Sequence, residues 1–186
     1  MINKELKKRI FSSIVLIPLS FFFIMQGSIP FIFYLSLIFA IVSFEWIRMT
    51  KKIEFIRILG LFFIIFSFYT TIHIRQDTGL NFFLFLIIIC IFTDIGGYLF
   101  GKTLKGPKLT NISPNKTYSG VVGSFLFSLI SGFLYVKYFD QSIIVLNKDP
   151  SFFILLILFI SFTSQIGDLI ISFFKRKAKL KDTGKI

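Results

Sequence analysis

The stretch FFLFLIIICIF, Phe82 to Phe92, indicates the fold most directly. It lies in an apolar segment, 80–100, that is long enough to cross a hydrocarbon core of about 30 Å as a helix. Strands of a membrane barrel alternate apolar with polar residues, and this stretch does not. The whole chain of 186 residues is 55% hydrophobic and only 16% charged, whereas about a quarter of the residues of a soluble domain are charged. We therefore expect one all-α, polytopic membrane domain over 1–186.

Further apolar segments lie on both sides of this stretch, and the charges between them predict a topology. Six transmembrane helices are expected, at 10–26, 29–46, 55–74, 80–100, 118–139 and 151–174. Both termini and the second and fourth connections together carry 18 of the 21 Lys and Arg residues. Cytosolic segments of membrane proteins are enriched in Lys and Arg. This alternation favours an even number of spans with both termini in the cytosol.

Two acids interrupt the apolar spans. Asp94 and Asp168 lie within or near the ends of the fourth and sixth spans, where an idle carboxylate costs several kcal/mol. Gln165, Asp168, Ser172 and Lys175 also share one face of a helix, because they are three or four residues apart. Acids beside a group of cations suit Mg²⁺ with phosphates, since the metal binds the acids and the cations bind phosphoryl oxygens. A structural salt bridge or a snorkelling acid is the alternative interpretation.

The remaining features are less specific. The fourth connection, 101–117, mixes glycine, lysine and hydroxyl residues, which suits either a phosphate-binding segment or a basic loop on lipid headgroups. Small residues recur every four positions in the fourth and fifth spans, and they predict close helix packing.

Trp46 is expected to anchor the second span at the membrane interface. Cys90 and His73 have no neighbours that suggest a site. The net charge of +12 is ascribed to cytosolic loops and not to nucleic-acid binding.

Two segments resemble a known family, the phosphatidate cytidylyltransferases or CDP-diacylglycerol synthases. DIGGYLFGK, then KLTNISPNKTYSG, within 94–120, is similar to that family's D-x-G-A-Y-x-x-G-(R/K) and K-L-x-x-x-I-S-P-x-K-T-x-x-G. QIGDL and SFFKRKAKLKDTGKI, within 165–186, resemble its Q-x-G/S-D-L and the opening of its S-x-x-K-R…K-D-x-G signature. Ser119 stands where the family often has Glu. The chain ends at Ile186, before the family's P-x-H-G-G-x-x-D-R-x-D, so a truncated chain is expected.

The resemblance implies a transfer of CMP from CTP to phosphatidic acid, giving CDP-diacylglycerol and pyrophosphate. It also implies Mg²⁺ as cofactor, membrane lipids as partners, and an active site on the cytosolic side of the inner (plasma) membrane. Self-association is left open. The rival interpretations are an inactive truncated fragment and a small transporter that couples cations through the two intramembrane acids.

Carried over by motif, the implied site has four groups of residues. The catalytic residues are Asp182, Asp168 and Lys181, and the metal ligands are Asp182 and Asp168. Lys175, Arg176 and Ser172 of the signature would bind substrate. Ser113, Lys116 and Thr117 would bind the nucleotide, and Asp94 is placed near the site without a specified contact.

Overall fold

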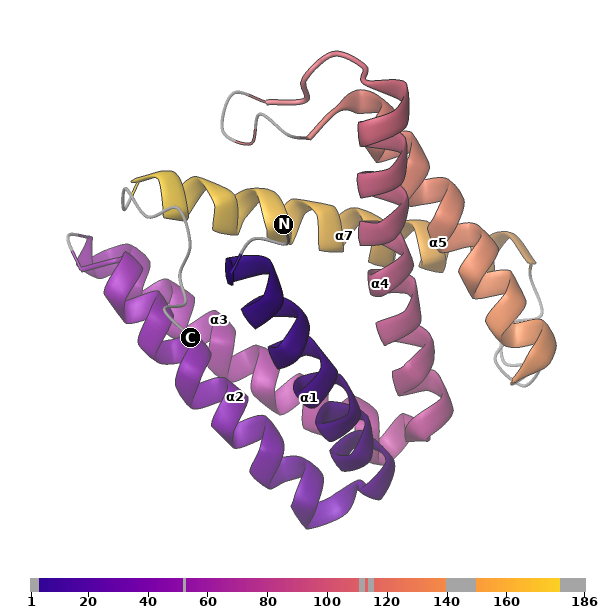
Figure 1. Ribbon diagram of the computed structural model, residues 1–186. Helices are drawn as coiled ribbons and strands as arrows, with labels where there is room; N and C mark the ends of the chain where they lie inside the picture. Colours follow the sequence, from indigo (N-terminus) through magenta and orange to yellow (C-terminus); the bar gives the residue numbers. More distant parts are fainter. Residues whose placement is uncertain (1–3, 52, 111–112, 114–115, 140–149, 178–186) are drawn as a thin grey trace. The chain divides into compact units, whose positions relative to one another are not determined.

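The computed structural model describes residues 4–51, 53–110, 113, 116–139 and 150–177. Each predicted span lies on a helix: α1 (Lys4–Gln26), α2 (Ser28–Met49), α3 (Glu54–His73), α4 (Gly79–Leu104), α5 (Tyr118–Tyr138) and α7 (Pro150–Lys177). A short π-helical segment, η1 (Ile74–Thr78), joins α3 to α4 (Figure 1). The protein is thus an all-α polytopic membrane protein, as expected.

Within the described residues, four stretches are long and apolar enough to span a membrane. They are Ser28–Met49, Glu54–Leu104, Tyr118–Tyr138 and Ser151–Lys177. The second runs through α3, η1 and α4, and a shorter apolar helix, Phe11–Gln26, lies in α1. Most of the large apolar side chains on these helices are exposed, as suits helices surrounded by lipid. The number of six membrane crossings stays a prediction.

The chain divides into two compact units, and the first comprises Met1–Leu80. In this unit α2 packs against both α1 and α3. Trp46 is buried, and a Cβ added at Gly60 would lie 2.0 Å from its Cε2 atom. Its indole Nε1 donates to the Arg57 carbonyl at 3.1 Å. The ring therefore fills the contact between α2 and α3, because Gly60 leaves room for it. The expected position of Trp46 at the membrane interface stays a prediction.

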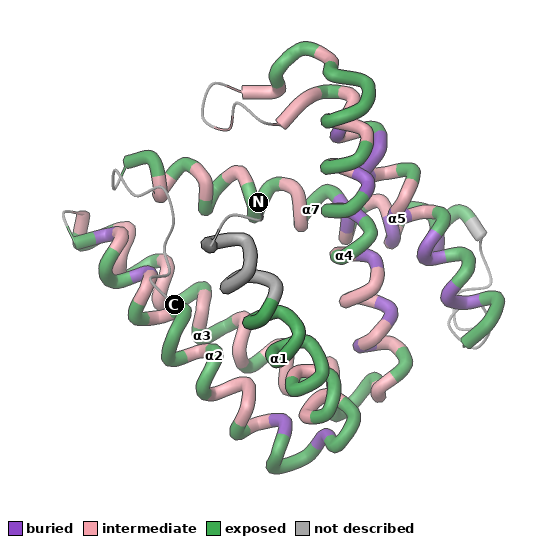
Figure 2. Tube along the Cα trace, viewed as in Figure 1, coloured by how far each residue is buried: buried purple, intermediate pink, exposed green. Residues whose placement is uncertain are grey.

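The second unit, Asn81–Ile186, contains the remaining helices and the main core. Phe85 and Ile89 of α4 form a buried cluster with residues of α5 and α7. Figure 2 shows buried positions along α4 and α5. Contacts between α4 and α7 follow the same direction along both helices, since Phe85 stacks on Phe153 and, further along, Thr93 bonds to Ser161. The three helices therefore meet at this core, and they form walls of the site described next.

Candidate functional site

A cavity of about 240 Å³ opens among α4, α5, α7 and the connection between α4 and α5. Its walls combine two acids, one lysine, hydroxyl groups and small residues. The lining residues are Thr93, Asp94, Gly97, Tyr98, Lys116, Thr117, Gly120, Val121, Ser124, Gln165 and Asp168. All of them belong to the second unit, so the site is contained in one compact part of the chain.

Glycines bring the backbones of α4 and α5 together beside Asp94. A Cβ added at Gly96 would lie 2.3 Å from the Gly123 carbonyl oxygen, and one added at Gly120 would lie 2.9 Å from the Gly97 carbonyl oxygen. Side chains at these positions would therefore force the helices apart. The small-residue stripes predicted as helix-packing surfaces are confirmed, and their close contact places Asp94 on one wall of the cavity.

Backbone hydrogen bonds position Lys116 in the connection between α4 and α5. The Leu109 N–H donates to the Lys116 carbonyl at 2.8 Å, and the Lys116 N–H donates to the Ser113 carbonyl at 3.0 Å. Thr117 then caps α5, because its hydroxyl accepts from the Gly120 N–H at 3.1 Å. Lys116 is thus held on both sides, immediately before the first turn of α5.

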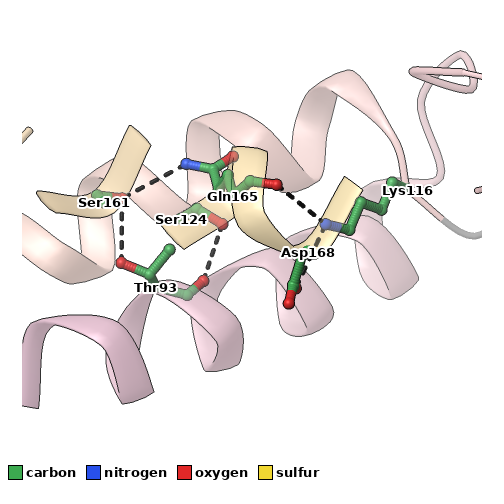
Figure 3. Close-up of polar contacts among 6 residues, drawn as sticks. All are labelled: Thr93, Lys116, Ser124, Ser161, Gln165 and Asp168. Carbon is green, nitrogen blue, oxygen red and sulfur yellow. Dashed lines mark hydrogen bonds and ion pairs between the residues drawn. The ribbon is translucent and has the colours of Figure 1, made fainter. Parts of the chain in front are cut away.

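Lys116 reaches across the cavity to α7 (Figure 3). Its Nζ lies 3.3 Å from Asp168 Oδ2 and 3.5 Å from the Gln165 carbonyl oxygen. The lysine side chain is 29% exposed and the aspartate side chain 58% exposed. An ion pair this open to its surroundings contributes little to stability, about 0–1 kcal/mol at exposed sites in water. The ion pair matters for function, since it brings the two motif segments, 94–120 and 165–186, together in the cavity.

A chain of hydrogen bonds closes the inner end of the site. Ser124 donates to the Thr93 carbonyl at 2.8 Å, and the Thr93 hydroxyl donates to Ser161 at 3.0 Å. Gln165 Nε2 donates to the same Ser161 hydroxyl at 3.4 Å. Thr93, Ser124 and Ser161 are buried, so these bonds satisfy polar groups that lipid could not. Sequence reasoning missed Thr93 and Ser161, although Ser161 extends the predicted α7 stripe by one helical turn.

Comparison with known protein sequences identifies the family of this chain. The sequence model of the cytidylyltransferase family matches residues 50–186. The chain belongs to the cytidylyltransferase family. Its relatives include proteins that are named phosphatidate cytidylyltransferase. The protein of Rickettsia bellii is 33% identical over 196 residues, covering 99% of this chain and 81% of the relative. No solved structure matches.

The staphylococcal relatives match over a smaller share of their length. The Staphylococcus haemolyticus protein is 36% identical over 120 residues, which are 64% of this chain and 43% of the relative. A Staphylococcus aureus protein is 37% identical over 112 residues, 60% of this chain and 41% of the relative. This cytidylyltransferase-family chain thus matches less than half the length of these relatives.

The predicted site residues divide into four groups. Asp94, Lys116, Thr117 and Asp168 line one cavity, although they come from three segments of the chain. Ser113 takes part in the turn that holds Lys116. Ser172, Lys175 and Arg176 lie on the last turns of α7 and are not among the residues that line the cavity. Lys181 and Asp182 lie outside the described residues.

The donor set of the cavity fits the magnesium ion that the family resemblance implies. Mg²⁺ is a hard cation that takes one or two carboxylates together with waters and substrate phosphates. Asp94 of α4 and Asp168 of α7 supply two carboxylates to the cavity, and the Lys116 ammonium already places a positive charge against Asp168. Within the described ranges no three His, Cys, Asp or Glu side chains lie together so that they could hold a metal ion. Asp94 and Asp168 would therefore hold the ion together with substrate oxygens.

Proposed function

We propose that this chain catalyses phosphatidate cytidylyl transfer, in which CTP and phosphatidic acid give CDP-diacylglycerol and pyrophosphate. The observation that carries the proposal is the convergence of Asp94, Lys116 and Asp168 on one cavity. These residues come from 94–120 and 165–186, the two segments that resemble the family motifs. The names of the relatives support the same reaction. Family membership also favours a transferase over a cation-coupled transporter.

The reaction joins a lipid phosphate oxygen to the α-phosphorus of CTP while the bond to pyrophosphate breaks. Such transfers depend on alignment and on neutralising phosphoryl charge, with little covalent work for the protein. Lys116 would bind the nucleotide phosphates, and the adjacent Thr117 would contact them at the start of α5. When bound, Mg²⁺ would neutralise further charge on the phosphoryl oxygens. Lys175, Arg176, Lys181 and Asp182 are proposed to complete the phosphate and metal contacts.

The depth of the site suits a reaction between a soluble nucleotide and a lipid. Asp94 and Asp168 lie ten and nine residues before the ends of α4 and α7, at Leu104 and Lys177. At 1.5 Å per residue this is about 15 Å from the basic ends of the helices. We propose that these ends face the cytosol from the plasma membrane, where CTP is available and where the positive-inside rule places them.

The test is direct synthesis by the purified chain in mixed micelles of detergent and phosphatidic acid. With labelled CTP and Mg²⁺ we expect labelled CDP-diacylglycerol, and we expect Asp168→Asn to lower the rate by about 100-fold or more, as loss of a main electrostatic contact does. Asp77→Asn is the matched control, because Asp77 pairs with His73 in the first unit. Absence of product from the folded chain, or full activity in Asp168→Asn, would contradict the proposal.

A further inference from the structure

The ion pair between Lys116 and Asp168 places a cation where the proposed function requires a metal ligand. Lys116 Nζ is 3.3 Å from Asp168 Oδ2, so the ammonium is bound to one of the two carboxylate oxygens. Its second contact is the Gln165 carbonyl oxygen at 3.5 Å, which a divalent cation beside Asp168 would also approach. The lysine therefore occupies space and an oxygen ligand that the cation would use.

Electrostatic repulsion disfavours the binding of both cations to Asp168 in this arrangement. A unit charge and a divalent ion about 4 Å apart repel by about 2 kcal/mol even at the dielectric constant of water, and by more at a partly buried site. Asp168 and Asp94 together carry two negative charges in the cavity, and Lys116 already offsets part of this charge. A divalent ion that arrives alone must displace the ammonium, and the cavity offers Lys116 no other acid among its lining residues except Asp94.

The nucleotide removes this obstacle. Lys116 precedes the first turn of α5, and its backbone is fixed by Leu109 and Ser113, so the side chain alone has to move. Phosphate oxygens are strong acceptors for an ammonium group. CTP phosphates entering the cavity would give Lys116 a new partner and would leave Asp168 to the metal that accompanies them.

We infer that Lys116 is an internal counter-ion of Asp168, which holds the carboxylate while the site is empty and transfers to a nucleotide phosphate when metal and nucleotide bind. This inference rests on the proposed function and deepens it, because it assigns an order to the binding of metal and nucleotide. A divalent cation alone binds weakly, and the triphosphate promotes its binding. Lys116 is in this sense a positioning residue for the metal in addition to a phosphate ligand.

The experiment measures the affinity of Mn²⁺ alone for the full chain in detergent, followed by electron paramagnetic resonance. Removing the ammonium in Lys116→Met should tighten Mn²⁺ binding by about threefold to tenfold, given the repulsion that it relieves. Lys116→Arg keeps the charge and should stay within about twofold of wild type. Lys102→Met is the matched control, because Lys102 bonds to Tyr98 at the cavity wall and to no acid within the described residues. Asp168→Asn should abolish most of the binding.

A second variant restores the charge within one folded preparation. Lys116→Cys is made with Cys90→Ala, so that the new thiol is the only one in the chain. Modification with 2-aminoethyl methanethiosulfonate places an ammonium near the original position, and we expect it to weaken Mn²⁺ binding towards the wild-type value. The neutral methyl reagent should leave the binding tight. This readout depends on charge alone and separates it from any loss of packing in Lys116→Met.

Two results would overturn the inference. One is Mn²⁺ binding in Lys116→Met that equals or is weaker than wild type, and the other is unchanged binding in Asp168→Asn. Either result, obtained with a chain that synthesises CDP-diacylglycerol, overturns the counter-ion role and leaves the proposed function intact. Tighter Mn²⁺ binding in Lys116→Met, together with absence of lipid product from the unsubstituted chain, supports the counter-ion role and contradicts the proposed function.

Discussion

Ser119 ties the two ends of the connection that carries Lys116. Its hydroxyl is 2.9 Å from the Thr117 hydroxyl and accepts from the Gly106 N–H at 3.4 Å. Gly106 follows the end of α4, and Ser119 lies in the first turn of α5, so these bonds close the base of the connection. The family often has Glu at this position. The serine is therefore expected to replace a charged contact with a short-range link between the two helix ends.

Substituting Ser119 tests this role. Ser119→Ala removes both hydrogen bonds, and we expect a loss of about 1 kcal/mol of stability together with a two- to fivefold higher KM for CTP, because Lys116 is less firmly placed. The kcat should change less. Ser36→Ala is the control, since the Ser36 hydroxyl bonds to the Phe33 carbonyl of its own helix and not to another segment of the described chain. An unchanged KM in Ser119→Ala would show that the link does not position Lys116.

Individual site residues could be predicted only where a physical cost marks them. Asp94 and Asp168 stand out in the sequence because an acid in an apolar span is expensive. Lys116 could be assigned only through its motif, since one lysine among several in a basic connection carries no such mark. Its contact with Asp168 joins residues 52 positions apart and depends on how α5 and α7 pack. Thr93 and Ser161 were missed for the same reason.

The contact between α4 and α5 depends on the absence of side chains at one face. Gly96 and Gly123 approach so closely that a Cβ on either would lie within 2.6 Å of the other's carbonyl oxygen. Without a hydrophobic force between helices in lipid, such close packing is a main source of their association. Asp94 lies on α4 and Thr117 caps α5, so the geometry of the cavity depends on the contact between these helices.

Gly96→Ala should therefore separate α4 from α5. We expect a loss of about 1–3 kcal/mol, as overpacking costs in a well-packed contact, a lower Tm in detergent and a weaker Mn²⁺ affinity. Gly167→Ala is the matched control, because a Cβ there meets nothing within 4 Å and alanine favours the helix. Equal Tm values for the two variants would contradict the importance of this glycine contact.

The helices themselves were the most predictable elements. Apolar runs of about 20 residues located six helices, and every predicted centre falls inside an observed one. Packing partners were less predictable, because hydropathy describes the contact with lipid and not the contact between helices. Trp46 illustrates this difference, since its place near a helix end predicts an interfacial depth but does not reveal that Gly60 leaves space for the ring to be buried against α3.

For the molecule as a whole, the number of crossings decides which side of the membrane carries the site. The helical run Glu54–Leu104 has 51 residues, or about 76 Å at 1.5 Å per residue. A single crossing needs about 30 Å, so the run is too long for one span and long enough for two. Gly79 has φ 89° and interrupts regular helix geometry between α3 and α4. We therefore expect two spans that meet near η1.

This topology predicts the accessibility of three positions in a Cys90→Ala background. If η1 lies on the side opposite to the basic connections, a membrane-impermeant maleimide added to intact cells should label Asp77→Cys. Lys51→Cys and Lys105→Cys lie in basic connections and should be labelled only after the cells are permeabilised. Labelling of all three after permeabilisation controls for local reactivity. Labelling of Lys105→Cys in intact cells would place the connection that carries Lys116 outside the cytosol, away from CTP, and would contradict both the six-span topology and the proposed orientation of the site.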